Sequence, residues 1–256
     1  MGDTRKRKRP HWTQQRGAAA PGLWLYGHHA VEAALRNSKR KAKRLVLTER
    51  AAEMLGKGLV GRVKHEIVDA DAVSRLLPPG AVHQGVALEC EPLPQGDIAH
   101  IAAAADGRRR IVLVLDQISD PQNTGAILRS AAAFGVSAVV VQDRHAPPES
   151  GALAKAASGA LDIVPYITVV NIARALKELS EHGFWRVGLA GDGEQTLKEA
   201  VSSGDIALVL GSEGSGIRRL VRENCDVAAY VPVETQMESL NVSNAAAVAL
   251  YECRRG

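Results

Sequence analysis

The sequence lacks the features of a membrane protein, a secreted disulfide-rich protein or a zinc protein. No apolar run among its 256 residues is long enough to cross a bilayer, and the basic N-terminus lacks the apolar segment of a signal peptide. The three cysteines, Cys90, Cys225 and Cys253, lie far apart and form no metal-ligand pair. No acidic cluster suggests another metal site. We therefore expect a cytoplasmic protein with reduced cysteines and no bound metal.

Aromatic residues are also scarce, at 4% of the chain, whereas hydrophobic residues make up 46%. A sizeable core can therefore form, but Ala, Val, Leu and Ile must provide most of its packing. The length suits one large domain or two small ones.

Positive charge is concentrated near the N-terminus. The formal net charge is +4, yet residues 1–20 hold six Lys and Arg residues and one acidic residue, so the rest of the chain is close to neutral. Residues 1–21 also lack hydrophobic periodicity, and we expect them to form a disordered basic tail. Such a tail is typical of an arm that binds nucleic acid, because neutralising phosphates releases counterions; a solubility tail is the alternative.

Periodicity and turn residues divide the remainder into two α/β units. Residues 22–91 form a small unit, residues 92–108 a linker that contains Pro and Gly, and residues 109–256 a second unit. The second unit opens with the apolar run Ile111–Leu115, which is typical of a strand buried on both faces. Strands that alternate with helices predict a mostly parallel sheet covered on both sides, with ligand sites at the carboxyl ends of its strands.

The predicted elements follow from apolar spacing and from helix start and stop signals. The predicted strands are Leu23–Tyr26, Arg44–Thr48, Gly85–Glu89, Ile111–Leu115, Ala138–Gln142, Ile163–Thr168, Arg186–Ala190, Ile206–Leu210 and Val227–Val231. The predicted helices are His28–Arg36, Ala51–Lys57, Ala70–Leu77, 97–105, Thr124–Phe134, Ala152–Ala157, Ile172–His182, Glu194–Val201, Ile217–Glu223 and Leu240–Arg254.

Three segments of the second unit carry polar residues that suit a binding site. The first, Asp120–Arg129 (DPQNTGAILR), follows a predicted strand and opens a helix. Asn123 can cap this helix and leave backbone N–H groups for an anion. Arg129 lies about 240° around the helix from Asn123, so the two side chains converge only if Asn123 precedes the helix. A capping Asn and an unrelated exposed Arg are the alternative.

The second segment, Leu208–Ile217 (LVLGSEGSGI), runs from a buried strand into Gly211, Gly214 and Gly216. Glycine lets the backbone approach a ligand closely, and Glu213 within the turn can hold a guanidinium or a ribose hydroxyl. The glycine order differs from that of the dinucleotide-binding fingerprint. A plain strand–helix turn is the alternative.

The third segment, Val231–Asn244 (VPVETQMESLNVSN), leads into an Ala-rich helix. Ser239, Asn241 and Ser243 are small polar residues, and one helix cap needs only one of them. We expect a loop that wraps a polar ligand; an over-capped helix is the alternative.

In this order and spacing, the three segments resemble the SpoU (TrmH-like) family of RNA ribose 2′-O-methyltransferases in the SPOUT superfamily. Upstream, Tyr26–Val31 (YGHHAV) and His83–Val86 (HQGV) resemble the small N-terminal domain of the branch that methylates a guanosine of large-subunit ribosomal RNA. The resemblance covers nearly all of residues 22–256. It implies a homodimer joined through an α/β C-terminal domain with a trefoil knot, and an L30e-like N-terminal domain that binds RNA.

The resemblance also implies S-adenosylmethionine as the cofactor, held against the backbone near Gly211, Val231 and Leu240. The residues that match those tied to catalysis and target binding are Asn123, Arg129, Glu213, Ser239 and Asn241. We expect the guanidinium of Arg129 to clamp the target phosphate and stabilise the developing alkoxide, because arginine is a poor proton acceptor. The family often has Gly where this chain has Thr235, so the loop around that position can follow another path.

Other functions remain open at this point. Within the family, the target can be a transfer-RNA guanosine or a ribosomal adenosine. The chain can also be a catalytically inactive RNA-binding scaffold, which would bind the cofactor without turnover. A nucleotide-dependent oxidoreductase that uses the glycine-rich turn is the function that agrees least with the three segments. It would bind NAD(P) and show no response to RNA.

Overall fold

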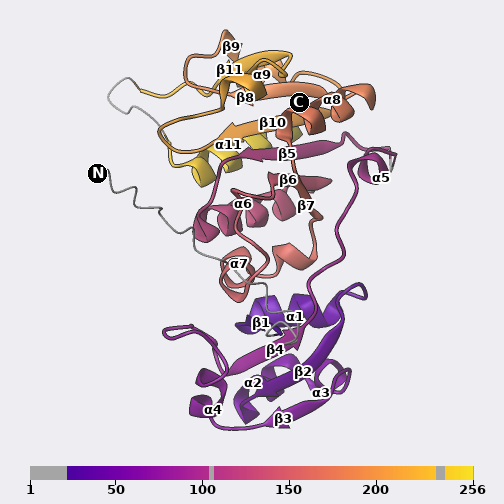
Figure 1. Ribbon diagram of the computed structural model, residues 1–256, viewed down its shortest axis with the longest axis vertical. Coiled ribbons are helices and arrows are strands. Elements are labelled where there is room, and N and C mark those ends of the chain that lie inside the picture. Colours follow the sequence, from indigo (N-terminus) through magenta and orange to yellow (C-terminus); the bar gives the residue numbers. More distant parts are fainter. Residues whose placement is uncertain (1–21, 104–106, 235–239, 256) are drawn as a thin grey trace, which may run out of the picture.

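The computed structural model describes residues 22–103, 107–234 and 240–255 of the chain. The basic tail predicted at residues 1–21 lies outside them. The described residues form two sheets at the two ends of an elongated molecule (Figure 1). Among these residues, no helix is both long and apolar enough to span a membrane.

The N-terminal part is a four-stranded sheet with short helices. Its elements are β1 (Leu23–Tyr26), α1 (His28–Arg36), β2 (Ala42–Leu47), α2 (Glu49–Leu55), α3 (Lys57–Val60), β3 (His65–Ile67), α4 (Ala70–Ser74) and β4 (Val86–Cys90). The strand order is β1-β4-β2-β3, in which only β2 and β3 pair in parallel. β3 was not predicted, because its three residues are all exposed at the sheet edge and show no apolar alternation.

The C-terminal part contains a seven-stranded sheet. Its strands are β5 (Ile111–Asp116), β6 (Ala138–Gln142), β7 (Tyr166–Val169), β8 (Trp185–Leu189), β9 (Gln195–Thr196), β10 (Ile206–Gly211) and β11 (Val227–Tyr230). Their order is β7-β6-β5-β10-β8-β11-β9, and every neighbouring pair is parallel. The expected α/β fold with a mostly parallel sheet is confirmed.

Helices cover both faces of this sheet. They are α5 (Ile98–Ala103), α6 (Pro121–Ala133), α7 (Gly151–Ala157), α8 (Ile172–Glu181), α9 (Leu197–Ala200), α10 (Arg219–Arg222) and α11 (Val242–Arg255), with the 3₁₀ turn η1 at Ala160–Asp162. Ile111, Leu113 and Leu115 of β5 pack on the face that carries α6, α7, α9 and α11. Val112 and Val114 pack on the opposite face with α5, α8 and α10. Successive side chains of β5 thus point to opposite faces of the sheet, and both faces are buried beneath helices.

Several predicted boundaries were wrong. The strand predicted at Ile163–Thr168 begins only at Tyr166, because η1 and the following turn occupy the residues before it. The helix predicted at Glu194–Val201 is divided into β9 and α9, since Gln195 and Thr196 pair with β11 and Thr196 caps the helix. The helix predicted from Thr124 begins three residues earlier, at Pro121.

Candidate functional site

The three predicted polar segments all leave the same edge of the parallel sheet. β5 and β10 pair in register, with Asp116 opposite Gly211, so both strands end together. β5 leads into α6, and β10 leads into the glycine-rich turn. The carboxyl edge of a parallel sheet is where ligands bind in such folds.

Asn123 lies in the first turn of α6 rather than at its cap, which corrects the prediction. The cap is Asp120, whose carboxylate accepts hydrogen bonds from the backbone N–H groups of Gln122 and Asn123, both at 3.1 Å. Pro121 follows as the first helical residue, where its missing N–H costs nothing. With the cap provided by Asp120, the side chain of Asn123 reaches across to Glu213.

Glu213 joins the three segments. One carboxylate oxygen, Oε1, accepts hydrogen bonds from Asn123 Nδ2 at 3.3 Å, from Asn241 Nδ2 at 2.6 Å and from the backbone N–H of Val242 at 3.2 Å. Asn241 Nδ2 also donates to Asn123 Oδ1 at 3.1 Å. Asn241 Oδ1 in turn accepts from the backbone N–H of Ser243 at 2.9 Å and from its hydroxyl at 2.6 Å. The network includes a direct hydrogen bond between side chains that are 118 positions apart in the sequence.

The turn that carries Glu213 is closed by backbone contacts. A Cβ on Gly211 would lie 2.0 Å from the carbonyl carbon of Gly216, so only glycine fits there. The N–H of Gly216 donates to the carbonyl of Ser212 at 2.9 Å, and Gly214 has a φ of +85°, which favours glycine. The backbone of the turn therefore fixes the direction of Glu213.

An ion pair between a buried aspartate and a partly exposed arginine anchors the far end of this turn. Asp116 is fully buried at the end of β5. Its carboxylate accepts one hydrogen bond from the backbone N–H of Arg218, at 2.9 Å, and two from the guanidinium of Arg218, at 2.6 and 2.8 Å. The guanidinium also donates to Gln142 Oε1 at 2.7 Å. Asp116 and Arg218 are not among the site residues predicted from the sequence. The available signal was an Asp that directly follows five consecutive apolar strand residues, since a carboxylate in such a place needs a partner.

A cavity of about 400 Å³ opens beside Glu213. Gly211, Val231 and Leu240, the three positions expected to contact the cofactor, all line it, together with Leu189 and Gly191. A Cβ on Gly191 would meet nothing within 4 Å, so bare backbone faces open space there. The volume lies within the ~300–1,000 Å³ of small-molecule sites, and the mix of apolar walls and exposed backbone suits a nucleoside.

Arg129 stands apart from the network. It is exposed on α6, and it forms no hydrogen bond or ion pair with any residue in the described parts of the chain. Its guanidinium is therefore available to a ligand. Ser239 and Thr235 lie outside the described residues. No group of three potential metal ligands occurs among the residues described.

Comparison with protein families matches both parts of the chain. The family described as SpoU rRNA Methylase matches residues 110–251, and the one described as RNA 2'-O ribose methyltransferase substrate binding matches residues 24–96. The 23S rRNA (guanosine-2'-O-)-methyltransferase RlmB of Xylella fastidiosa (strain Temecula1) is 39% identical over 246 residues, which cover 91% of this chain and 96% of the relative. The RlmB proteins of Coxiella burnetii and Escherichia coli K12 are 37% and 35% identical, with 90% of this chain covered by each.

Solved structures share the fold. The SpoU methyltransferase AviRb from Streptomyces viridochromogenes, in complex with AdoMet, has a TM-score of 0.77 at 21% identity, covering 92% of this chain and 90% of its own. A putative RNA methyltransferase of the TrmH family from Porphyromonas gingivalis has a TM-score of 0.74 at 24% identity, with the same coverage.

Proposed function

Because the chain belongs to the SpoU rRNA methylase family, we propose that it transfers the methyl group of S-adenosylmethionine to the ribose 2′-hydroxyl of a guanosine in 23S ribosomal RNA. The observation that carries the proposal is the polar network in which Asn123, Glu213 and Asn241, from three distant segments, meet beside a nucleoside-sized cavity. The three relatives compared above, which are 35–39% identical over at least 90% of this chain, all carry the name of this activity.

The cavity is the proposed cofactor site. Apolar side chains of Leu189, Val231 and Leu240 suit the faces of an adenine ring, and the backbone around Gly191 and Gly211 offers hydrogen bonds to its edge. When bound, S-adenosylmethionine supplies an electrophilic methyl group. The chain itself has to position the RNA and polarise the attacking oxygen.

Arg129 is the residue proposed to act on the RNA. A planar guanidinium can bind two phosphate oxygens at once and can stabilise negative charge on the 2′-oxygen as it attacks. Asn123, Glu213 and Asn241 hold the chain segments around this oxygen in a fixed arrangement. Ser239, two residues before Asn241, is proposed to contact the cofactor or the target.

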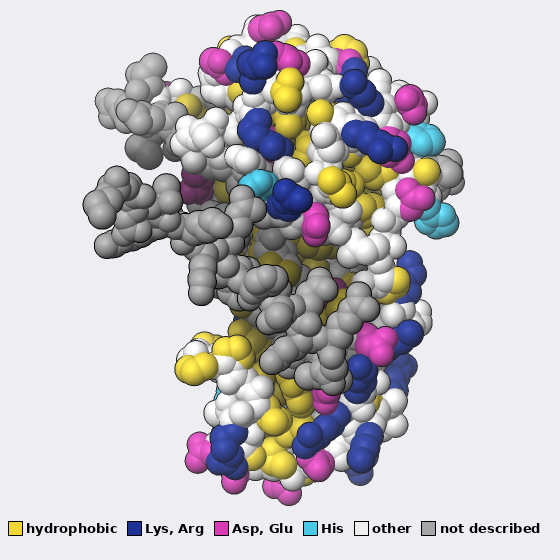
Figure 2. Space-filling model, viewed as in Figure 1, with side chains coloured by type: hydrophobic (Ala, Val, Ile, Leu, Met, Phe, Trp, Pro, Cys, Tyr) yellow, Lys and Arg dark blue, Asp and Glu magenta, His cyan; other side chains and the backbone are white. Residues whose placement is uncertain are grey.

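The N-terminal part is proposed to be an L30e-like domain, residues 22–91, that binds the RNA. Lys and Arg side chains lie along one side of this part in Figure 2. Lys41, whose side chain is 79% exposed, directly precedes β2, and Lys43 and Arg44 lie on β2. Their partners are the exposed carboxylates of Glu66 and Glu91. Exposed ion pairs contribute little free energy, so RNA phosphates can replace these carboxylates. The basic tail is proposed to add further phosphate contacts.

We also propose that the second domain, residues 109–256, is knotted and dimerises in the cytoplasm through α6 and α11. The knot is proposed from the family alone; in the described residues, α11 packs against α6. Val248 and Tyr251 on α11 are apolar and 44% and 54% exposed. Light scattering should give twice the monomer mass for the native chain and the monomer mass for Tyr251→Lys. An experimental structure that traces residues 235–239 tests the knot.

The substrate class can be tested with unmodified RNA. Purified protein is incubated with methyl-tritiated S-adenosylmethionine and, separately, with 23S rRNA, 16S rRNA and transfer RNA. The proposal predicts label in 23S rRNA alone. Label in another RNA contradicts 23S rRNA as the target but agrees with the proposed methyl-transfer reaction. Cofactor binding without transfer to any RNA, free or in ribosomal particles, indicates a scaffold protein.

A further inference from the structure

The N-terminal part packs directly on the C-terminal part. α7 and η1 lie against β1 and α1, as Figure 1 shows near the middle of the molecule. A Cβ on Gly151 would lie 2.4 Å from the carbonyl oxygen of Trp24, and one on Gly159 would lie 3.0 Å from Ala33 Cβ. Buried apolar residues of both parts belong to one continuous core. The two parts are therefore in close contact rather than joined only by a tether.

A buried arginine lies at this contact. The side chain of Arg40, which follows α1, is 0% exposed, and it pairs with Asp162 of η1, which is 2% exposed. Arg40 Nε and Nη2 donate to the two oxygens of Asp162 at 2.9 and 3.1 Å. Arg40 Nη1 donates to the carboxylate of Glu149 and, at 3.1 Å, to the carbonyl of Glu91. Burial lowers the pKa of Arg40, but its bonds to the two carboxylates outweigh this and raise it overall.

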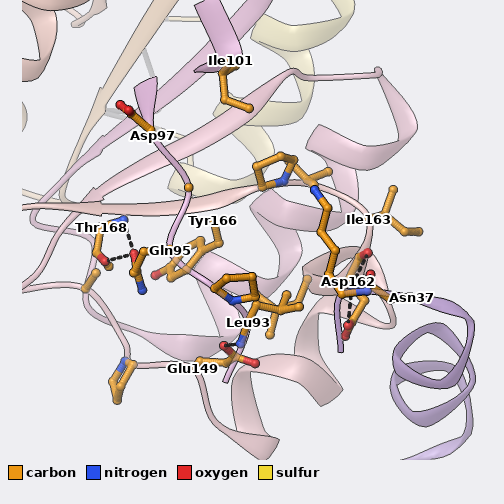
Figure 3. A pocket seen from close by; sticks show the side chains of 18 of the residues that line it. Asn37, Leu93, Gln95, Asp97, Ile101, Glu149, Asp162, Ile163, Tyr166 and Thr168 are labelled. Atoms are coloured by element: carbon orange, nitrogen blue, oxygen red, sulfur yellow. Dashed lines mark hydrogen bonds between the residues drawn. The ribbon is translucent and has the colours of Figure 1, made fainter. Parts of the chain in front are cut away.

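Glu149 also holds the segment that connects the two parts, and Asp162 also holds the residue that follows α1. Figure 3 shows Glu149 accepting from the backbone N–H of Leu93, at 2.9 Å, and Asp162 accepting from the side chain of Asn37, at 3.0 Å. Two residues further along, Gln95 Oε1 accepts from the backbone N–H of Thr168 on β7, at 3.3 Å. The connecting segment thus lies fixed along the C-terminal part at several points.

The ion pairs of Arg40 fix the orientation of the N-terminal part relative to the C-terminal part, in addition to holding the two parts together. An apolar interface tolerates small rotations, because its contacts are not directional. The planar fork of Arg40 satisfies Asp162 and Glu149 in one geometry only, and leaving any of these charges buried without its partner is costly. α7, next to Glu149, packs on α6 so closely that a Cβ on Gly125 would lie 2.4 Å from Ala156 Cβ. The contact at Arg40 is thus joined through α7 to α6, the helix that carries Arg129.

We propose that Arg40 is a positioning residue that fixes the orientation of the N-terminal part relative to α6, so that bound RNA presents its target ribose to Arg129. This inference rests on the proposed function. It predicts that the loss of the Arg40 fork weakens productive RNA binding, whereas the cofactor cavity, which neither Arg40 nor its two carboxylate partners line, keeps its affinity.

The test compares Arg40→Met with Arg186→Met. Arg186 pairs with Asp226 in a similar fork, but within the C-terminal part and at the amino end of β8, away from the cavity. Arg40→Met should raise the KM for 23S rRNA at least tenfold and leave the Kd for S-adenosylmethionine within twofold. Arg186→Met should change neither. An unchanged KM for RNA in Arg40→Met overturns the proposal.

A second measurement does not depend on activity. Spin labels at Met54→Cys and Leu220→Cys, both at exposed positions, report the distance between the two parts in a Cys225→Ser background. The distance distribution should be narrow in the parent protein and broad in Arg40→Met; a narrow distribution in both overturns the proposal. If the parent protein transfers no methyl group to RNA, the proposed function fails, and this distance still tests Arg40. If Arg40→Met does not fold, Arg40→Lys should fold and give intermediate results for both measurements.

Discussion

Replacing Glu213 by alanine removes the acceptor on which the three chain segments converge. The two shorter of its three hydrogen bonds, to Asn241 Nδ2 at 2.6 Å and to the N–H of Val242 at 3.2 Å, hold the start of α11. A hydrogen bond to a charged group contributes about 1.5–3 kcal/mol, and the lower value applies because Glu213 is exposed. The loss is then about 3 kcal/mol, which corresponds to a decrease in kcat/KM of roughly 100-fold.

Glutamine at position 213 keeps an acceptor oxygen but loses the charge. Neutral hydrogen bonds contribute about half as much, so Glu213→Gln should lose roughly tenfold in kcat/KM. The assay is methyl transfer to unmodified 23S rRNA under subsaturating RNA. Glu223→Ala is the matched control and should stay within twofold of the parent, since among the described residues the side chain of this exposed glutamate pairs with Arg219 alone, one helical turn away. If Glu213→Ala keeps more than a third of the parent's kcat/KM, the network does not position the reacting groups.

Three further predictions concern the guanidinium, the turn and acid stability. Arg129→Lys keeps the charge but loses the fork, so kcat should fall about 100-fold with an unchanged Kd for S-adenosylmethionine; a Lys variant with near-parental turnover would refute the clamp. Gly211→Ala places a Cβ 2.0 Å from Gly216, so calorimetry should give at least tenfold weaker cofactor binding, and parental affinity would contradict the assigned cavity. Burial raises the pKa of Asp226, but its bonds to Arg186 outweigh this and lower it overall. The folded state therefore binds fewer protons than the unfolded state, and stability should fall as the pH falls below about 4. Urea titrations should find this acid loss smaller in Arg186→Met, and an identical loss would refute the assignment.

The convergence of the three segments was predictable because it follows from the parallel sheet. Once Ile111–Leu115 and Ile206–Leu210 are recognised as buried parallel strands, the residues after them must emerge at the same edge. The start of α6 was also predictable, since Asp before Pro is a helix-start signal, but the cap predicted from the sequence was Asn123 rather than Asp120. The error matters, because the side chain of a capping Asn123 would be hydrogen-bonded to the backbone of the first helical turn and could not reach Glu213.

Other features depend on packing that local sequence does not encode. Arg40 and Asp162 are 122 residues apart, and each looks like an ordinary surface charge in its own segment. They meet only because α1 and η1 dock against each other, which depends on small residues such as Gly159 on one side and Ala33 on the other. The same holds for Asp116 and Arg218, which lie 102 residues apart.

The most direct test of the function is the chemical identity of the product. Unmodified 23S rRNA is incubated with the protein and S-adenosylmethionine, digested to nucleosides and analysed by mass spectrometry, with Glu213→Ala as the control. We predict one new product, 2′-O-methylguanosine, at about one per RNA molecule for the parent protein and strongly reduced for Glu213→Ala. A methyl group on a base, on another ribose, or in equal amount from both proteins would contradict it.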